Sequence, residues 1–587
     1  MRRYAFTSSW FRQCMSCPVV FILVYLLIVV FELPVAIADK DCANNKPIVI
    51  DVRSNNQPES IDSELVAVDG VIRYLHPVID MQKLLLNGKH EIQPINLSES
   101  RLHNLNNSMK DNNGSNLQVD SLLSMIGREE DDGFGISVAG VNDFNGDGYH
   151  DFVIGAPFHW GDAYLYFGGK VLDSIPDIEI HGDYSLGWPV ASAGDINCDG
   201  FGDFILGAAL HGENRTGKVY IFFGSRYDAA YISIGGFEEK ERFGADVASL
   251  GDINRDGYDD IIVGTADYNR SGKAYLFFGG SPMDTIPDFV FQEGEPGENF
   301  GYALASAGDL NGDDAPDIII GNRWIVVDRV WIYYGGSLLD SIPDLIFSGP
   351  KHSDFGWEVG TAGDINNDGF DDVMVSAHWY TDVPGITPPG YGRLYIYHGG
   401  TTMDTVPDLI IKGTIPRGDF SIGLSTLGDI NFDAYDDIAV GAFGPNSNEI
   451  SKARVFLGGQ TMGNADTLAD VVIEGESIGD YFSNSLSGTH DLNGDGLNDL
   501  IIGANEHTTI LWQDGKAYVY SILPGKRGDI NGDGKINAID VVMLINIIIG
   551  RSSPPVEYEL WAADIIVDKA INIEDVLEMV NLILEFH

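Results

Sequence analysis

The chain has 587 residues and a formal net charge of −52, because 87 Asp and Glu outnumber 35 Lys and Arg. A charge of this size and sign repels nucleic acid and anionic membrane surfaces, so neither is expected as a partner. Since 44% of the residues are hydrophobic and 11% aromatic, the sequence has ample apolar material for a packed core, unlike a disordered acidic chain.

Residues 1–38 have the features of an export signal. An arginine-containing start precedes an unbroken apolar run from Val19 to Phe31, and Ala36-Ile37-Ala38 forms a small-x-small cleavage site. The alternative is a membrane anchor, but a spanning helix needs about 20 apolar residues, and Glu32 and Pro34 interrupt this run. We therefore predict a protein that is secreted or associated with a cell surface, with no membrane span after cleavage.

Residues 39–116 are polar and rich in Asn and Ser, and we assign them as a spacer of unknown role. After signal cleavage only Cys42 and Cys198 remain, which is too few for a disulfide framework. In an exported protein, other stabilising bonds are then expected, and metal ions are one source.

From residue 117 to 524 the sequence repeats seven times with a period that is typical of solenoids and propellers. The third unit shows four short β-branched and aromatic runs, at residues 243–251, 261–264, 273–278 and 287–291, each bounded by Gly, Asp or Pro. Such runs predict strands joined by hairpins. Seven units of four strands predict a mainly β fold, a seven-bladed β-propeller.

The seventh unit ends after its third strand, at Ile522, whereas residues 119–126 stand before the first unit in the place of a fourth strand. We predict that this early segment completes the last blade, because this pairing removes the free edges of the ring.

Each unit contains one copy of the pattern D-x-N-x-D-x-x-x-D. The candidate metal ligands of the ring are Asp143, Asn145, Asp147 and Asp151; Asp195, Asn197, Asp199 and Asp203; Asp252, Asn254, Asp256 and Asp260; Asp309, Asn311, Asp313 and Asp317; Asp364, Asn366, Asp368 and Asp372; Asp429, Asn431, Asp433 and Asp437; and Asp491, Asn493, Asp495 and Asp499.

Calcium prefers six to eight oxygen ligands in flexible geometry, and positions 1, 3, 5 and 9 of this pattern supply three carboxylates and an amide. Position 6 must turn sharply, which favours Gly; Asp314 and Ala434 replace it in the fourth and sixth units. The alternative is that Asp, Asn and Gly serve only as turn residues. Seven copies with one spacing favour structural Ca²⁺ sites.

A small C-terminal domain, residues 525–587, has loops of a different length. Asp529, Asn531, Asp533, Asn537 and Asp540 occupy positions 1, 3, 5, 9 and 12 of an EF-hand-like loop, and Asp564, Asp568, Asn572 and Asp575 form a second loop with Ile566 at position 3. Helices are predicted at 541–549 and 576–584, without entering helices, so this domain is expected to be all-α. Whether the second loop binds Ca²⁺ stays open.

The repeats resemble FG-GAP repeats of the integrin α propeller. Phe134-Gly135 and Gly155-Ala156-Pro157 carry the full signature, while the sixth and seventh units have Ile422-Gly423 and Phe482-Ser483 in the place of Phe-Gly. The resemblance implies a calcium-binding propeller and, on fold analogy alone, adhesion.

The tail resembles a type I dockerin, which implies docking onto a cohesin module of a scaffold protein. The residue pairs before the last loop acids, Ala538-Ile539 and Ile573-Glu574, match the cohesin-binding positions of that family. The two pairs differ, so the resemblance leaves open whether either half can dock. The alternative is an EF-hand pair that only holds the C-terminus.

The loops after the second strand of each unit lie on the ring face opposite the metal loops. They carry the aromatic residues Trp160, Trp324 and Trp379, which are candidates for binding a glycan or an extracellular protein. Packing within the blade is the alternative for each of them.

Two functions follow. The first is an exported, non-catalytic calcium-binding propeller that binds a glycan or protein and is tethered through its dockerin. The second is a dockerin-borne polysaccharide-degrading enzyme, such as a glycoside hydrolase, with an unrecognised active site on the propeller. The first is favoured, because no nucleophile elbow or zinc motif is present and 39–116 is small for a catalytic domain.

Overall fold

A computed structural model describes residues 117–585, apart from 129–130, 183, 227–229, 267–270, 295–297, 323–327, 382–389, 415–418, 443–448, 460–461, 463–467, 509–513, 532–534, 551–554, 556 and 568–569. Before residue 117 it describes only two strand pairs, β1 (Val35–Ile37) with β2 (Ile50–Val52) and β3 (Leu65–Val68) with β4 (Val71–Tyr74). The predictions of an export signal in 1–38 and of a spacer in 39–116 otherwise lie outside the described residues.

The chain divides into two compact units. One is residues 108–524, and the other takes in 1–107 and 525–587. We describe the ring and the C-terminal helices separately.

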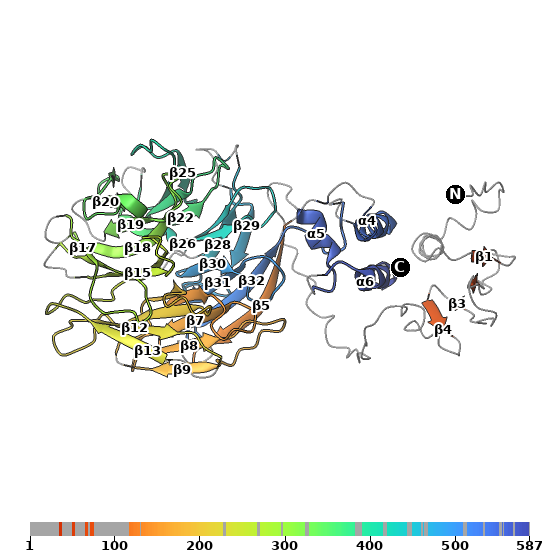
Figure 1. Cartoon of the computed structure of the whole chain (residues 1–587), viewed down its shortest axis with the longest axis horizontal. Helices are drawn as coiled ribbons and strands as arrows, with labels where there is room; N and C mark the ends of the chain where they lie inside the picture. The colour runs from red at the N-terminus through yellow and green to blue at the C-terminus, as the bar shows by residue number, and fades with distance from the viewer. Residues whose placement is uncertain are drawn as a thin grey trace. The chain divides into compact units, whose positions relative to one another are not determined.

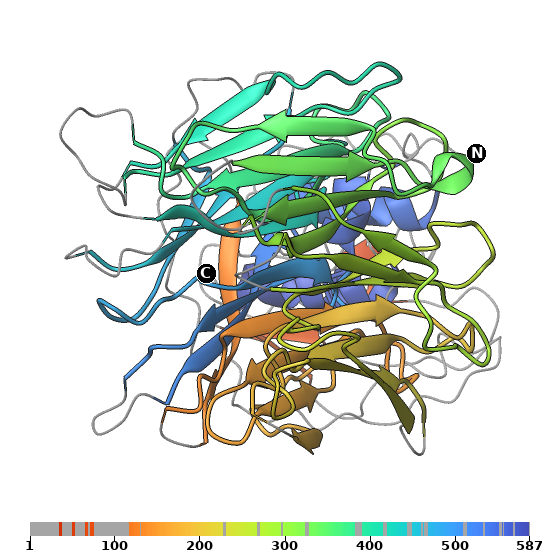
Figure 2. The same cartoon turned by 90° about the vertical axis from the view of Figure 1, so that its left-hand side faces the viewer.

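The ring consists of seven four-stranded antiparallel sheets. The first three are β6 (Ser137–Val141), β7 (Asp151–Ala156), β8 (Asp162–Tyr166) and β9 (Ile178–His181); β10 (Val190–Gly194), β11 (Asp203–Gly207), β12 (Lys218–Phe223) and β13 (Ala230–Gly235); and β14 (Val247–Gly251), β15 (Asp260–Gly264), β16 (Ala274–Phe277) and β17 (Phe289–Phe291). The next three are β18 (Phe300–Gly308), β19 (Asp317–Asn322), β20 (Arg329–Tyr333) and β21 (Leu345–Ser348), with the short 3₁₀ helix η2 (Gly336–Leu338); β22 (Phe355–Gly363), β23 (Asp372–Ala377), β24 (Arg393–Tyr397) and β25 (Leu409–Lys412); and β26 (Phe420–Gly428), β27 (Asp437–Ala442), β28 (Lys452–Phe456) and β29 (Val471–Glu474). These sheets follow one another around the ring in chain order (Figure 2).

The seventh sheet closes the ring by joining the two ends of the repeat region. Its strand order is β30 (Leu486–His490), β31 (Asp499–Ala504), β32 (Lys516–Leu523) and β5 (Gln118–Ile126). β5 pairs with β32 from Gln118↔Leu523 to Ile126↔Lys516, and Figure 1 shows this orange strand beside the blue one. The predicted seven-bladed propeller and its closing strand are therefore confirmed.

The second strand of every blade is fully buried, because neighbouring blades cover both of its faces. One core cluster combines Ile319, Ile332 and Phe347 of the fourth blade with Val373 and Tyr397 of the fifth. Phe347 and Tyr397 stack with ring centroids 4.0 Å apart. The apolar repeats of the sequence thus pack between blades as well as within them.

The Phe-Gly position of each blade requires a left-handed backbone, with φ of 84° at Gly135 and 91° at Gly356. In the sixth blade Phe420 pairs with Ala442 as Phe355 pairs with Ala377 in the fifth. The sixth signature is therefore Phe420-Ser421, and our assignment of Ile422-Gly423 was wrong. Ser421 has φ of 71°, and its hydroxyl donates to the carbonyl of Arg393 at 2.7 Å.

Among its described residues, the C-terminal region contains three helices, α4 (Ala538–Ile548), α5 (Glu557–Ala563) and α6 (Ile573–Glu585). α4 and α6 begin three residues before the predicted starts at 541 and 576, because the asparagines that precede them act as N-caps. α5 was not predicted. It enters the second loop directly, so that loop has an entering helix, contrary to the sequence-based expectation.

Candidate metal-binding loops and docking surface

The seven nine-residue loops share one hydrogen-bond framework. The carboxylate at position 1 accepts the backbone N–H of position 5 at 2.9–3.0 Å and that of position 6 at 2.7–2.9 Å in every loop. Position 6 has positive φ throughout, including 65° at Asp314 and 70° at Ala434. The prediction of a sharp turn at this position is confirmed, even where Gly is replaced.

The buried Asp at position 9 connects its loop to another hairpin of the same blade. One carboxylate oxygen accepts the N–H of position 2 at 2.8–3.2 Å in all seven loops. In six blades the other oxygen accepts the N–H of a glycine that follows the third strand, at 2.8–2.9 Å. A residue that only forms a turn does not need to bond a second hairpin. The Asp at position 9 therefore also connects two parts of its blade.

Burial is the main reason why the pKa of the position-9 carboxyls is raised, to about 7 for Asp151 and about 8 for Asp372 and Asp437. The carboxylates at positions 1 and 5 raise these pKa values further. A cation bound among the three carboxylates would relieve this repulsion.

Within the described part of the chain, the acidic side chains do not form a group of three or more that is already arranged around a metal position. The donor set nevertheless fits a hard cation, because it consists of carboxylate and amide oxygens. At position 3 of the second loop, the side-chain oxygen of Asn197 is buried and accepts no hydrogen bond from the protein. Such an oxygen is suited to coordinate an ion.

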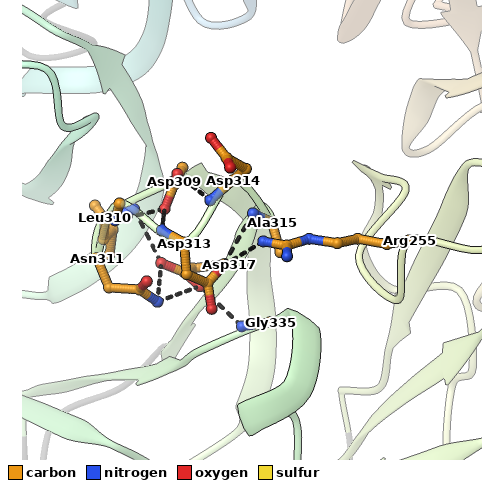
Figure 3. A network of polar contacts seen from close by, with 10 residues as sticks. Arg255, Asp309, Leu310, Asn311, Asp313, Asp314, Ala315, Asp317 and Gly335 are labelled. Atoms are coloured by element: carbon orange, nitrogen blue, oxygen red, sulfur yellow. Dashed lines mark hydrogen bonds and ion pairs between the residues drawn. The ribbon is translucent and has the colours of Figure 1, made fainter.

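In the fourth loop, an arginine of a neighbouring blade contacts one of the candidate ligands. Asn311, Asp313 and Asp317 lie close together in this loop, and the guanidinium of Arg255 lies 2.8 Å from the Asp313 carboxylate (Figure 3). Arg255 is position 4 of the third loop. A cation bound at this loop would compete with Arg255 for Asp313.

The residue at position 8 of several loops accepts a hydrogen bond from the preceding loop of the ring, a contact that the sequence analysis did not predict. Asp259, Asp371 and Asp436 accept the N–H groups of Asp195, Asp309 and Asp364, the first residues of the preceding loops, at 2.7–2.9 Å. At the ring closure, His150 accepts the N–H of Asp491 at 3.2 Å. In the sequence, this contact is indicated by the Asp that occupies position 8 in three of the units.

In the tail, the last acid of each loop also holds the start of a helix. Asp540 accepts the N–H groups of Asn531 and Asn537, and the Asn537 side chain accepts that of Ile539, which completes a capping box. Asp575 accepts the N–H groups of Ile565, Ile566 and Asn572 in the same way. The second loop thus keeps this framework despite Ile566; Asp533 and Asp568 lie outside the described residues.

The predicted cohesin-binding pairs form the first residues of α4 and α6. Ile539 is 56% exposed and Glu574 is exposed, whereas Ala538 and Ile573 are half-buried. Leu577, one turn along α6 from Ile573, is 45% exposed. The helix starts therefore present apolar side chains to solvent.

Of the three tryptophans predicted to bind a ligand, Trp160 follows β7 and is 74% exposed. Trp379 follows β23, is half-buried and lies beside the buried His378. Trp324 lies outside the described residues. In the described part of the chain, no helix has the length and apolar character needed to cross a membrane.

Comparison with known proteins agrees with this architecture. The FG-GAP repeat family model matches residues 134–166, 243–277, 355–397 and 482–520, and the Dockerin type I domain model matches 527–584. Integrin alpha-5 of Xenopus laevis is 32% identical over 235 residues, covering 38% of this chain and 21% of that protein. Integrin alpha-IIb of Mus musculus is 35% identical over 213 residues, or 32% and 20%.

Phosphatidylinositol-glycan-specific phospholipase D of Bos taurus is also similar, with 31% identity over 188 residues, or 29% of this chain and 21% of that protein. The matched segments span about a fifth of the length of these relatives.

The fold and the matched repeats define a seven-bladed FG-GAP propeller that is followed by a type I dockerin domain. In its propeller the chain is a homologue of the integrin α subunits. Both parts are domain types known to bind calcium.

Proposed function

We propose that this chain is an exported, non-catalytic, calcium-stabilised propeller that binds a glycan or an extracellular protein and is tethered by its dockerin to a cohesin-bearing scaffold or cell surface. The proposed boundaries are 1–38 for the signal, 39–116 for the spacer, 117–524 for the propeller and 525–587 for the dockerin. The observation that carries the tether is the exposed apolar start of α4 within the matched dockerin domain.

In this proposal the cation ligands of the ring are positions 1, 3, 5 and 9 of the seven loops. Those of the tail are positions 1, 3, 5, 9 and 12 of the first loop and positions 1, 5, 9 and 12 of the second, where Ile566 occupies position 3. Bound calcium would supply positive charge at the raised-pKa carboxyls and fix each loop against its blade. The chain's own residues already hold these loops through backbone N–H groups, so the cation adds to an existing framework.

The docking surface consists of Ala538 and Ile539 at the start of α4 and Ile573 and Glu574 at the start of α6. An exposed Ile beside an Ala on a capped, rigid helix end suits insertion into an apolar surface of a partner. In the second half Glu574 stands where Ile539 stands in the first. We therefore assign the main contact to the first half.

The test is capture of the chain on an immobilised type I cohesin module in calcium, with and without residues 525–587. We expect capture of the full chain, loss of capture on truncation, and a loss of at least tenfold in affinity for Ile539→Asp. The matched control is Ile548→Asp, the same substitution at the other end of α4, where Ile548 is 37% exposed and lies outside the docking surface. Equal capture of the full and truncated chains would refute the tether.

A further inference from the structure

The first blade has a surface hollow whose lining residues do not belong to the repeated metal-loop motif. Its volume is about 460 Å³, and it is lined by Arg128, Trp160, Asp162, Tyr164, Glu179 and His181. Trp160 lies in the turn between β7 and β8, and Arg128 follows the closing strand β5. The volume lies within the range of about 300–1,000 Å³ that is usual for small-ligand pockets.

The floor of the hollow consists of two facing residue pairs on two neighbouring strands. Asp162 pairs with His181 and Tyr164 pairs with Glu179 between β8 and β9. Because residues two apart on a strand share a face, all four side chains project to the same side of the sheet. The strands therefore position this polar floor rigidly.

The other six blades provide an internal reference. The residue equivalent to Asp162, just before or at the start of the third strand, is basic in each of them: Lys218, Lys273, Arg329, Arg393, Lys452 and Lys516. Lys273, Lys452 and Lys516 form ion pairs with Glu238, Glu474 and Glu476. In the first blade a short acid replaces the long basic chain, which leaves room for the hollow and reverses the charge at its floor.

The carboxylates that line the hollow already have internal partners. Arg128 forms an ion pair with Glu179, and Nδ1 of His181 lies 2.9 Å from the Asp162 carboxylate. The guanidinium of Arg128 also lies 5.8 Å from the centre of the Tyr164 ring. The floor thus offers fixed hydrogen-bond donors and acceptors without an unpaired carboxylate that would select a cationic ligand.

Trp160 gives this polar floor an apolar wall. Its side chain is 74% exposed, and a large aromatic surface left in water beside a pocket is a sign of a binding site. A flat apolar ring next to paired donors and acceptors matches a pyranose, which has an apolar C–H face and a rim of hydroxyl groups. A peptide arginine or lysine would have to displace Arg128 or His181 from its carboxylate.

We propose that the first blade binds a neutral sugar ring of a glycan in this hollow, with Trp160 stacking on the ring and Asp162, Glu179 and His181 hydrogen-bonding its hydroxyl groups. The inference rests on the proposed ligand-binding role of the propeller and assigns that role to one blade and one ligand class. The basic residues at the equivalent position of the other six blades give the reference against which Asp162 stands out.

The experiment screens the full chain, in calcium, against an array of neutral oligosaccharides and measures the best binder by calorimetric titration. Trp160→Ala and Asp162→Lys are the test variants; the second restores the residue type of the other blades. We expect each to weaken binding at least tenfold, which corresponds to about 1.4 kcal/mol. Trp160→Phe should recover part of the affinity, because it keeps an aromatic platform.

Tyr231→Ala is the matched control, because Tyr231 is an aromatic residue on β13 of the second blade and is 59% exposed; it should leave the affinity within twofold. Unchanged melting temperature and cohesin capture in all variants show that the fold and the tether are intact. Failure of cohesin capture alone would refute the tether and leave this site untouched.

Absence of any neutral oligosaccharide binding by the wild-type chain would overturn the inference. Sugar binding that survives both test variants would also overturn it, while a glycan-binding propeller with its site elsewhere would stand. Binding of a basic peptide, lost in Trp160→Ala and without sugar binding, would assign the hollow to a protein partner instead.

Discussion

The nine-residue loops of the ring and the twelve-residue loops of the tail use the same residue types but end in different structures. In the ring the last Asp begins a buried strand and holds the end of another hairpin in place. In the tail the last Asp lies in the first turn of a helix and caps it. The ring is also held together by strand pairing and by a core between blades, whereas the described part of the tail consists of short helices and loops. Loss of a stabilising strand or cation should therefore have different effects on the ring and on the tail.

The largest effect is expected when the closing strand is removed. Deletion of residues 117–126 exposes the edge of β32 and leaves Leu500, Ile522 and their neighbours without a covering strand, so the ring should lose its cooperative melting transition and aggregate. Thermal melting and size-exclusion chromatography measure this. A deletion of equal length at 101–110 is the control; the same melting curve for both deletions would contradict the closure.

Removal of calcium should separate the two regions. With EDTA we expect the tail to unfold at 25 °C, because a domain of about 60 residues has little core of its own, whereas the ring should stay folded with a melting temperature at least about 10 °C lower. Circular dichroism at 222 nm and calorimetry follow the two transitions. A melting profile unaffected by EDTA would refute calcium stabilisation in both regions.

Substitutions within one loop should distinguish the cation from the backbone framework. Asp260→Ala leaves the part-buried N–H of Gly279 without its acceptor, at a cost of about 1–3 kcal/mol with or without calcium, whereas the N–H of Ile253 keeps the Gly251 carbonyl at 3.0 Å. Asp256→Ala, at an exposed position, should destabilise only in calcium. Denaturant unfolding in calcium and in EDTA gives the comparison, and Asp260→Asn should be intermediate. Equal effects of the two alanine variants in EDTA would contradict the framework.

The smallest effect is a pH dependence confined to the ring. Burial raises the pKa of Asp246 from 3.8 to about 7, although Leu304 and Val247 donate backbone N–H groups to it. Between these values the unfolded chain is ionised and the folded chain still holds the proton, so stability falls as pH rises from about 4 to 7 and then levels off.

Asp246→Asn removes this penalty, and its melting temperature should exceed that of the wild type by about 2 °C or more at pH 8, with no gain at pH 4. Calorimetry at the two pH values measures the difference. A constant offset at both would rule out titration of Asp246 as the cause.

The sequence predicted the ring well, because seven copies in one register make strand order, turn positions and closure visible together. It failed where a copy departs from the repeat. Ser421 replaces Gly at a left-handed position and hid the sixth signature, since its hydroxyl compensates through the Arg393 carbonyl. α5 was missed because its seven residues, Glu557–Ala563, are too short for a clear helical period.

The site was predicted in its residue types but not in its contacts. Positions 1, 3, 5 and 9 are visible in the sequence, whereas the hydrogen bond from Gly279 to Asp260 joins residues that are 19 apart and depends on the blade. Asp162 was overlooked because it belongs to no motif; only its comparison with the six basic counterparts identifies it.

The most direct test of the account is the calcium content of the full chain and of the chain without residues 525–587, measured by native mass spectrometry after desalting from calcium buffer. We predict one ion for each of the seven ring loops in both proteins and one or two more in the full chain. Calcium content that is the same with and without the tail, or a ring that retains no calcium, would contradict the division of the loops into ring fasteners and docking loops.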